Sequence, residues 1–310
     1  MTTLSVLLLF SLINSVISSK FDPATHRGWH LVNDKKCGIR TQLRVIGGQD
    51  VTIGEFPWVV EFSVTKTKEN ITGFCTGAII SDQFVITAAH CQPEVPYTSK
   101  IIVGNVDRNQ DPDCDAETNI CAPPMKEYEV DKFFHPDYVH FPNGRDIALV
   151  KIHDKFEFND FVSPICLEHG ELISKDYTGS DAEFAGWGLL KIDPVTNESS
   201  AHTTMQKITL PVQNKSGCAH SIDFILLSSD IEHDKDSFIC AGGTAGEYIF
   251  PGDSGGVLAV AETVGDDIPR FYGLGVAAMC SEVPSIADVF TKISYYMEWI
   301  MDTIANESKI

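Results

Sequence analysis

From Val45 onward, the chain alternates short apolar runs with clusters of Gly, Pro, Asn and Asp. The runs are rich in β-branched and aromatic residues, as in FPWVVEFSV, QFVITAAH and RFYGLGVAAM. Short segments of this composition, separated by turn-forming residues, are typical of strands in a sandwich or a barrel. The pattern therefore predicts an all-β domain.

The last apolar segment, ISYYMEWIMDTIA, has a different period. Ile293, Met297 and Ile300 are spaced so that they fall on one face of a helix. We therefore expect the β domain to end in an amphipathic C-terminal helix.

The N-terminal residues contain the apolar run LSVLLLFSLI, followed by the small residues Ser18 and Ser19. This run is too short to cross a bilayer of about 30 Å as a helix, and its pattern is typical of a cleavable signal. We expect a signal peptide at residues 1–19 and a secreted, extracellular protein; a signal anchor is the alternative.

Charge and cysteine content narrow the function classes. The formal net charge of −20 repels phosphate backbones and anionic lipids, so we expect neither nucleic acid nor a membrane as partner. Nine cysteines at irregular spacings favour disulfides in an oxidising compartment over a metal site, and the odd number leaves at least one thiol over. Asn-X-Ser/Thr triplets suit a secreted glycoprotein and begin at Asn70, Asn197, Asn214 and Asn306.

A polar loop raises the question of calcium binding. Its oxygen-bearing side chains alternate along the chain at Asp107, Asn109, Asp111 and Asp113. An EF-hand loop needs Gly at its sixth position and Glu at its twelfth, where this chain has Pro112 and Thr118. We therefore predict a solvated acidic loop, and we expect no metal and no cofactor.

Three segments carry the residues that acyl transfer by serine requires. VITAAHC contains His90, GRDIALV contains Asp146 and GDSGG contains Ser254. A serine nucleophile needs an imidazole to take its proton and a carboxylate to orient that imidazole. Glycines beside the serine allow a tight turn, in which the N–H groups of Gly252 and Ser254 can face a developing oxyanion.

The order His, Asp, Ser, together with RVIGG, FPWVV, TAAHC, GWG and FTKISYYMEWI, resembles the chymotrypsin-like (trypsin-fold) serine proteases. The likeness runs from about Cys37 to the C-terminal helix. It implies two six-stranded antiparallel β-barrels with a C-terminal α-helix and the active site between the barrels. In this family pattern His90 is the general base, Asp146 orients it, Ser254 is the nucleophile, and Gly252 and Ser254 form the oxyanion hole.

The segment TQLRVIGGQ is similar to the activation site of the family, with the scissile bond between Arg44 and Val45. Cleavage by a trypsin-like protease would free the ammonium of Val45, which the resemblance pairs with Asp253. An unpaired buried carboxylate costs several kcal/mol, so this pairing would couple cleavage to the oxyanion hole.

The resemblance divides the chain into a signal peptide at 1–19, a propeptide or light chain at 20–44, and a serine protease domain at 45–310. The expected partners are a protein or peptide substrate, the activating protease and a serpin-type inhibitor.

The resemblance also implies four disulfides: Cys37–Cys166, Cys75–Cys91, Cys114–Cys121 and Cys218–Cys240. The third of these is similar to an extra loop bridge of arthropod clip-type proteases. We expect no six-cysteine clip domain in this chain, so the likeness to that group is partial.

The sequence departs from the family pattern around the specificity pocket. Phe250 replaces a cysteine of the usual pocket disulfide, which leaves Cys280 as the expected odd thiol. Ala278, Met279 and Cys280 stand where a Ser-Trp-Gly trio is usual. Glycine in the trio admits the substrate side chain, so a cysteine narrows the entrance. The serine normally donates to the orienting carboxylate, and losing one such donor costs on the order of 1–3 kcal/mol.

The base of the pocket is altered as well. Tyr248 occupies the position of the acid that pairs with Arg or Lys of the substrate in trypsin-like relatives, and Asp288 replaces a glycine nearby. Asp288 either supplies a carboxylate near the pocket base or is buried against Tyr248. Both readings predict an unusual specificity.

Two hypotheses follow. The first is a secreted zymogen serine endopeptidase of unusual specificity, because the triad, the oxyanion glycines and the activation site are all present. The alternative is a catalytically weak or inactive homologue that acts as a regulatory binding protein, because the trio and the pocket disulfide are altered.

Overall fold

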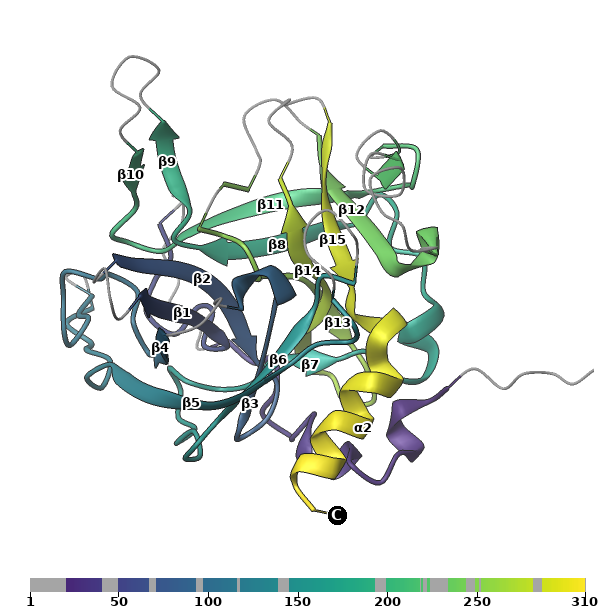
Figure 1. Ribbon diagram of the computed structural model, residues 1–310, viewed down its shortest axis with the longest axis horizontal. Coiled ribbons are helices and arrows are strands. Elements are labelled where there is room, and N and C mark those ends of the chain that lie inside the picture. Colours follow the sequence, from purple (N-terminus) through teal and green to yellow (C-terminus); the bar gives the residue numbers. More distant parts are fainter. Residues whose placement is uncertain are drawn as a thin grey trace, which may run out of the picture.

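The computed structural model describes residues 21–40, 50–66, 71–92, 97–115, 118–138, 145–192, 199–217, 219, 222–223, 234–243, 249–250, 252–280 and 286–309. Two antiparallel β-barrels make up the body of the protein (Figure 1). The first is drawn in blue and teal, and the second runs from teal through green to yellow.

The N-terminal barrel is closed, with the strand order β1-β2-β3-β6-β5-β4. Its strands are β1 (Val59–Lys66), β2 (Ile71–Ile79), β3 (Phe84–Thr87), β4 (Tyr97–Val103), β5 (Lys126–Phe134) and β6 (Ala148–Ile152). Branched and aromatic side chains fill its interior, among them the fully buried Phe62, Ile86 and Leu149. The short apolar runs of the sequence are these strands.

The C-terminal barrel follows the order β13-β8-β11-β12-β15-β14, and pairing of β13 with β14 closes it. Its strands are β8 (Asp181–Gly186), β11 (Gln206–Gln213), β12 (Phe238–Gly242), β13 (Val257–Thr263), β14 (Pro269–Met279) and β15 (Ala287–Lys292). The short β7 (Cys166–Leu167) adds to β14 in parallel, and β9 (Leu189–Ile192) pairs separately with β10 (Ser199–Ala201). The prediction of two six-stranded barrels is confirmed.

The chain ends in the predicted helix. A 3₁₀ turn, η6 (Ile293–Tyr296), leads into α2 (Met297–Glu307), whose buried face includes Met297, Ile300 and Ile304. The other 3₁₀ turns are η1 (Pro23–Thr25), η2 (Trp29–Leu31), η3 (Ala89–Cys91), η4 (Gly170–Ser174) and η5 (Lys235–Ser237). Within the described ranges, no helix has both the length and the apolar character needed to cross a membrane.

Residues 21–40 pack against the main domain, next to α2 (Figure 1). His26 Nε2 lies 3.2 Å from a carboxylate oxygen of Asp302, and Arg27 donates to Asn306 Oδ1 at 2.5 Å. The predicted signal peptide and the predicted scissile bond lie outside the described residues.

Three of the four expected disulfides are present: Cys37–Cys166, Cys75–Cys91 and Cys114–Cys121. Cys240 is also disulfide-bonded, but its predicted partner Cys218 lies outside the described residues. Cys280 keeps its thiol. The first bridge ties residues 21–40 to β7 and so to the main domain.

Candidate active site

His90 and Asp146 come together because β3 and β6 are neighbours in the barrel. His90 lies in η3 directly after β3, Asp146 lies just before β6, and Thr87 pairs with Ala148 in the register of the two strands. Nδ1 of His90 lies 2.6 Å from Oδ2 of Asp146, and the backbone amide of His90 donates to Oδ1 at 2.9 Å.

This pairing sets the state of the imidazole. Because an ionised carboxylate can only accept, the proton lies on Nδ1 of His90, and Nε2 is left to act as a base. Burial by itself lowers the pKa of His90, but the hydrogen bond and the negative charge of Asp146 outweigh it, so the pKa is raised.

Ser254 lies in the turn of residues 252–255, the serine turn, which contacts the N-terminal barrel. Its carbonyl accepts from the amide of Thr76 at 2.8 Å. Gly255, at φ +81°, fits so closely that a Cβ there would lie 2.1 Å from Oγ1 of Thr87. The turn therefore packs against the end of β3, beside His90. Among the described residues no hydrogen bond joins the Ser254 hydroxyl to the His90 ring; such bonds often form only with substrate bound.

The backbone of this turn fits an oxyanion hole. Gly252 has φ +101°, a conformation that residues with a Cβ rarely adopt, and its carbonyl accepts from Oγ1 of Thr76 at 3.1 Å. In the described part of the chain, neither the amide of Gly252 nor that of Ser254 donates to another group. Both remain available to a substrate carbonyl.

Asp253 is buried beneath the turn, with 8% of its surface exposed. Its Oδ1 accepts from the amide of Gly188 at 2.8 Å and its Oδ2 from the amide of Phe250 at 3.0 Å. Burial raises its pKa to about 6, although the two backbone hydrogen bonds oppose the shift. Its predicted partner Val45 lies outside the described residues.

The predicted specificity residues gather at one end of the C-terminal barrel. Met279 pairs with Val289 where β14 meets β15, so Ala278–Cys280 lies beside Asp288. Asp288 is 1% exposed, and its Oδ2 accepts from the amide of Ile249 at 3.2 Å. It therefore lies next to the segment that leads into the serine turn. Tyr248 lies outside the described residues.

The acidic loop differs from the prediction at one residue. Asp113 is buried rather than solvated, because its carboxylate accepts from the amides of Val106 and Asp107. It holds the loop together in the way a turn-forming side chain does. In the described residues, Cys75, His90 and Cys91 lie close enough to share a metal ion, but the two cysteines form a disulfide.

Two of the four predicted glycosylation sites, Asn214 and Asn306, are exposed. The other two, Asn70 and Asn197, lie outside the described residues.

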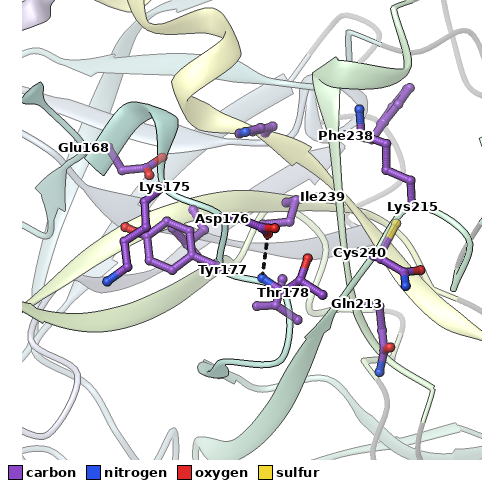
Figure 2. A pocket seen from close by; sticks show the side chains of 14 residues that line it. Glu168, Lys175, Asp176, Tyr177, Thr178, Gln213, Lys215, Phe238, Ile239 and Cys240 are labelled. Atoms are coloured by element: carbon purple, nitrogen blue, oxygen red, sulfur yellow. Dashed lines mark hydrogen bonds between the residues drawn. The ribbon is translucent and has the colours of Figure 1, made fainter. Parts of the chain in front are cut away.

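A separate pocket of about 290 Å³ opens on the C-terminal barrel and contains none of the triad residues. Figure 2 shows Glu168 and Tyr177 on one side of it and Phe238 and Cys240 on the other. Glu168 is 1% exposed, and burial raises its pKa to about 7.

The sequence did not predict the ion pair between Glu61 and Arg108, because neither residue belongs to a recognisable motif. The one signal is that Glu61 interrupts the apolar run FPWVVEFSV, at a position that proves to be buried. A charge inside a buried strand needs a partner, but the sequence does not show which residue supplies it.

Comparison with known proteins agrees with the fold. A family model described as Trypsin matches residues 45–300. Spaetzle-processing enzyme of Drosophila melanogaster is 31% identical over 94% of this chain and 74% of its own length, and phenoloxidase-activating factor 3 of Holotrichia diomphalia is 30% identical over 87% and 75%. The crystal structure of the Drosophila Grass clip serine protease of the Toll pathway superposes with a TM-score of 0.70 at 27% identity, covering 89% of this chain and 77% of that one.

Proposed function

The chain belongs to the trypsin family of serine proteases and is a serine endopeptidase. We propose that it hydrolyses peptide bonds with His90, Asp146 and Ser254, and that it is secreted as a zymogen activated by cleavage between Arg44 and Val45. The 2.6 Å contact between His90 and Asp146, beside the turn that carries Ser254, is the observation that carries the proposal.

The geometry suits the following reaction. Nε2 of His90 takes the hydroxyl proton while Oγ of Ser254 attacks the scissile carbonyl, and the amides of Gly252 and Ser254 stabilise the oxyanion. The imidazolium, oriented by Asp146, then protonates the leaving amine. Water attacks the acyl-enzyme by the same route and releases the new carboxylate.

The environment of Asp253 supports the zymogen step. The carboxylate of Asp253 is buried and its pKa is raised, and among the described residues no ion pair includes it. The ammonium of Val45, freed by cleavage, would supply a counter-charge and so favour the turn in which the oxyanion amides are available.

The substrate is proposed to be a protein cut at few sites. Relatives are named for processing or activating other proteins, and the altered pocket residues, with Cys280 at the entrance and Asp288 near the base, favour an unusual and narrow specificity. Secretion and N-glycosylation at Asn214 and Asn306 complete the proposal.

The test is activation with trypsin of the secreted chain and of Arg44→Gln. Trypsin is inhibited before hydrolysis is measured in either sample. We expect the parent to have a new N-terminus at Val45 and to hydrolyse a denatured protein substrate. We expect the variant to show neither. Equal hydrolysis by the variant would contradict activation at this bond. A parent cut at Val45 that hydrolyses nothing would favour a binding protein.

A further inference from the structure

Glu61 is a charged residue buried on the outer face of the N-terminal barrel, because its neighbour Phe62 on the strand points into the interior. It is 3% exposed, lies on β1, and pairs directly with Thr76 of β2 in the strand register. Nε of Arg108 donates to its Oε2 at 2.5 Å. Because a buried charge is costly unless it is paired, the carboxylate of Glu61 depends on Arg108 as its partner.

Arg108 also contacts two aromatic rings from different barrels. Its Cζ lies 4.8 Å from the ring centroid of Phe74 on β2 and 5.3 Å from that of Trp187, which follows β8. Both distances are within the range of a cation–π contact. The indole of Trp187 in turn donates to the carbonyl of Val106, two residues before Arg108, at 3.0 Å.

One of the two rings that Arg108 contacts, Phe74, lies on β2, the strand that is hydrogen-bonded to the serine turn. Phe74 lies two residues before Thr76 and on the same face of the strand. Thr76 donates from its amide to the carbonyl of Ser254 and from its hydroxyl to that of Gly252.

In the C-terminal barrel, Trp187 immediately precedes Gly188, whose amide binds Asp253. The positive charge of Arg108 also affects the pKa of Asp253. Burial is the main influence and raises the pKa of Asp253, while Arg108 opposes it by favouring the ionised form.

We propose that Arg108 and Glu61 form a positioning pair that holds Thr76 from one barrel and Trp187–Gly188 from the other, and so fixes the oxyanion hole. The inference rests on the proposed function. Neither residue touches the reacting atoms; both act through the backbone of the serine turn. A merely structural pair would affect unfolding and leave the catalytic step unchanged.

The experiment compares activated parent enzyme with the double variant Arg108→Met/Glu61→Gln, which removes both charges and leaves neither unpaired. We expect kcat on a peptide amide substrate to fall about tenfold, less than the loss of an oxyanion donor itself, while KM stays within about twofold. Arg108→Lys keeps the charge but not the planar stacking group, and we expect a smaller fall in kcat, about threefold.

The matched control is Lys155→Met/Asp82→Asn, which removes an ion pair exposed to solvent on the N-terminal barrel. We expect its kcat and KM to equal those of the parent. An unchanged kcat in the double variant, or in Arg108→Lys if the double variant does not fold, would overturn the inference. If the parent itself is inactive after cleavage, the proposed function fails instead.

Discussion

The backbone amide of Gly188 donates to the buried carboxylate of Asp253 at 2.8 Å, across a contact that leaves no space for a side chain. A Cβ on Gly188 would lie 2.1 Å from Oδ2 of Asp253, and one on Gly186 would lie 2.4 Å from Oδ1. The two glycines of the GWG motif are therefore explained by the carboxylate that they enclose.

Gly188→Ala is expected to displace Asp253 and with it the serine turn. Overpacking of this kind costs about 1–3 kcal/mol, and chemical denaturation together with fluorophosphonate labelling measures both effects. Gly73→Ala is the control, because a Cβ there meets nothing within 4 Å. Normal labelling of Gly188→Ala would contradict the role given to this contact.

The stability of the uncleaved chain should depend on the protonation of Glu168. Burial raises its pKa from 4.5 to about 7, so the unfolded chain loses this proton first as the pH rises. Stability is then lost between about pH 4.5 and 7 and stays lower above that range.

Glu168→Gln should therefore be more stable than the parent at pH 8, with a smaller difference at pH 4. Urea denaturation at both pH values measures this. Glu171→Gln, in the exposed first turn of η4, should show no such difference. If Glu168→Gln were more stable than the parent by the same free energy of unfolding at both pH values, the raised pKa of Glu168 would be contradicted.

Ala278→Ser should improve catalysis. In the family pattern a serine at this position donates to the orienting carboxylate, and one hydrogen bond to a buried charge contributes about 1–3 kcal/mol. We expect kcat to rise by about tenfold. Ala278→Val, which adds volume without a donor, should give no gain, and a gain in both variants would point to packing instead.

Cys280→Gly should open the entrance to the specificity pocket. Peptide substrates with bulky side chains before the scissile bond should be cut at least about tenfold faster, the size expected when 1.4 kcal/mol is recovered. Labelling of Ser254 by a small fluorophosphonate should change little, because the reagent needs little of the pocket. Cys280→Ser keeps the size of the side chain and should behave like the parent.

The sequence motifs, through their resemblance to a known family, were enough to predict the fold and to predict that three distant segments lie close together. VITAAHC, GRDIALV and GDSGG each place a reactive side chain at the end of a strand or in a tight turn, and the structure brings these segments together. The disulfides that lie within the described residues followed from the same resemblance.

The burial of individual charged residues was not predictable in the same way. Asp113 looks like part of a solvated loop in the sequence, but it is buried because two backbone amides face it. Glu61, on strand β1, has its partner Arg108 47 positions away on a loop. Such pairings depend on strand register and loop packing, which local sequence patterns do not encode.

Fluorophosphonate labelling of the secreted chain before and after cleavage at Arg44, with Ser254→Ala as control, tests both the activation step and the role of Ser254. We expect labelling of the parent only after cleavage and none of Ser254→Ala at any stage. Equal labelling before cleavage would contradict the zymogen step. No labelling after cleavage, with a free Val45 amine confirmed by N-terminal sequencing, would contradict the proposal that the His90–Asp146–Ser254 arrangement is catalytic.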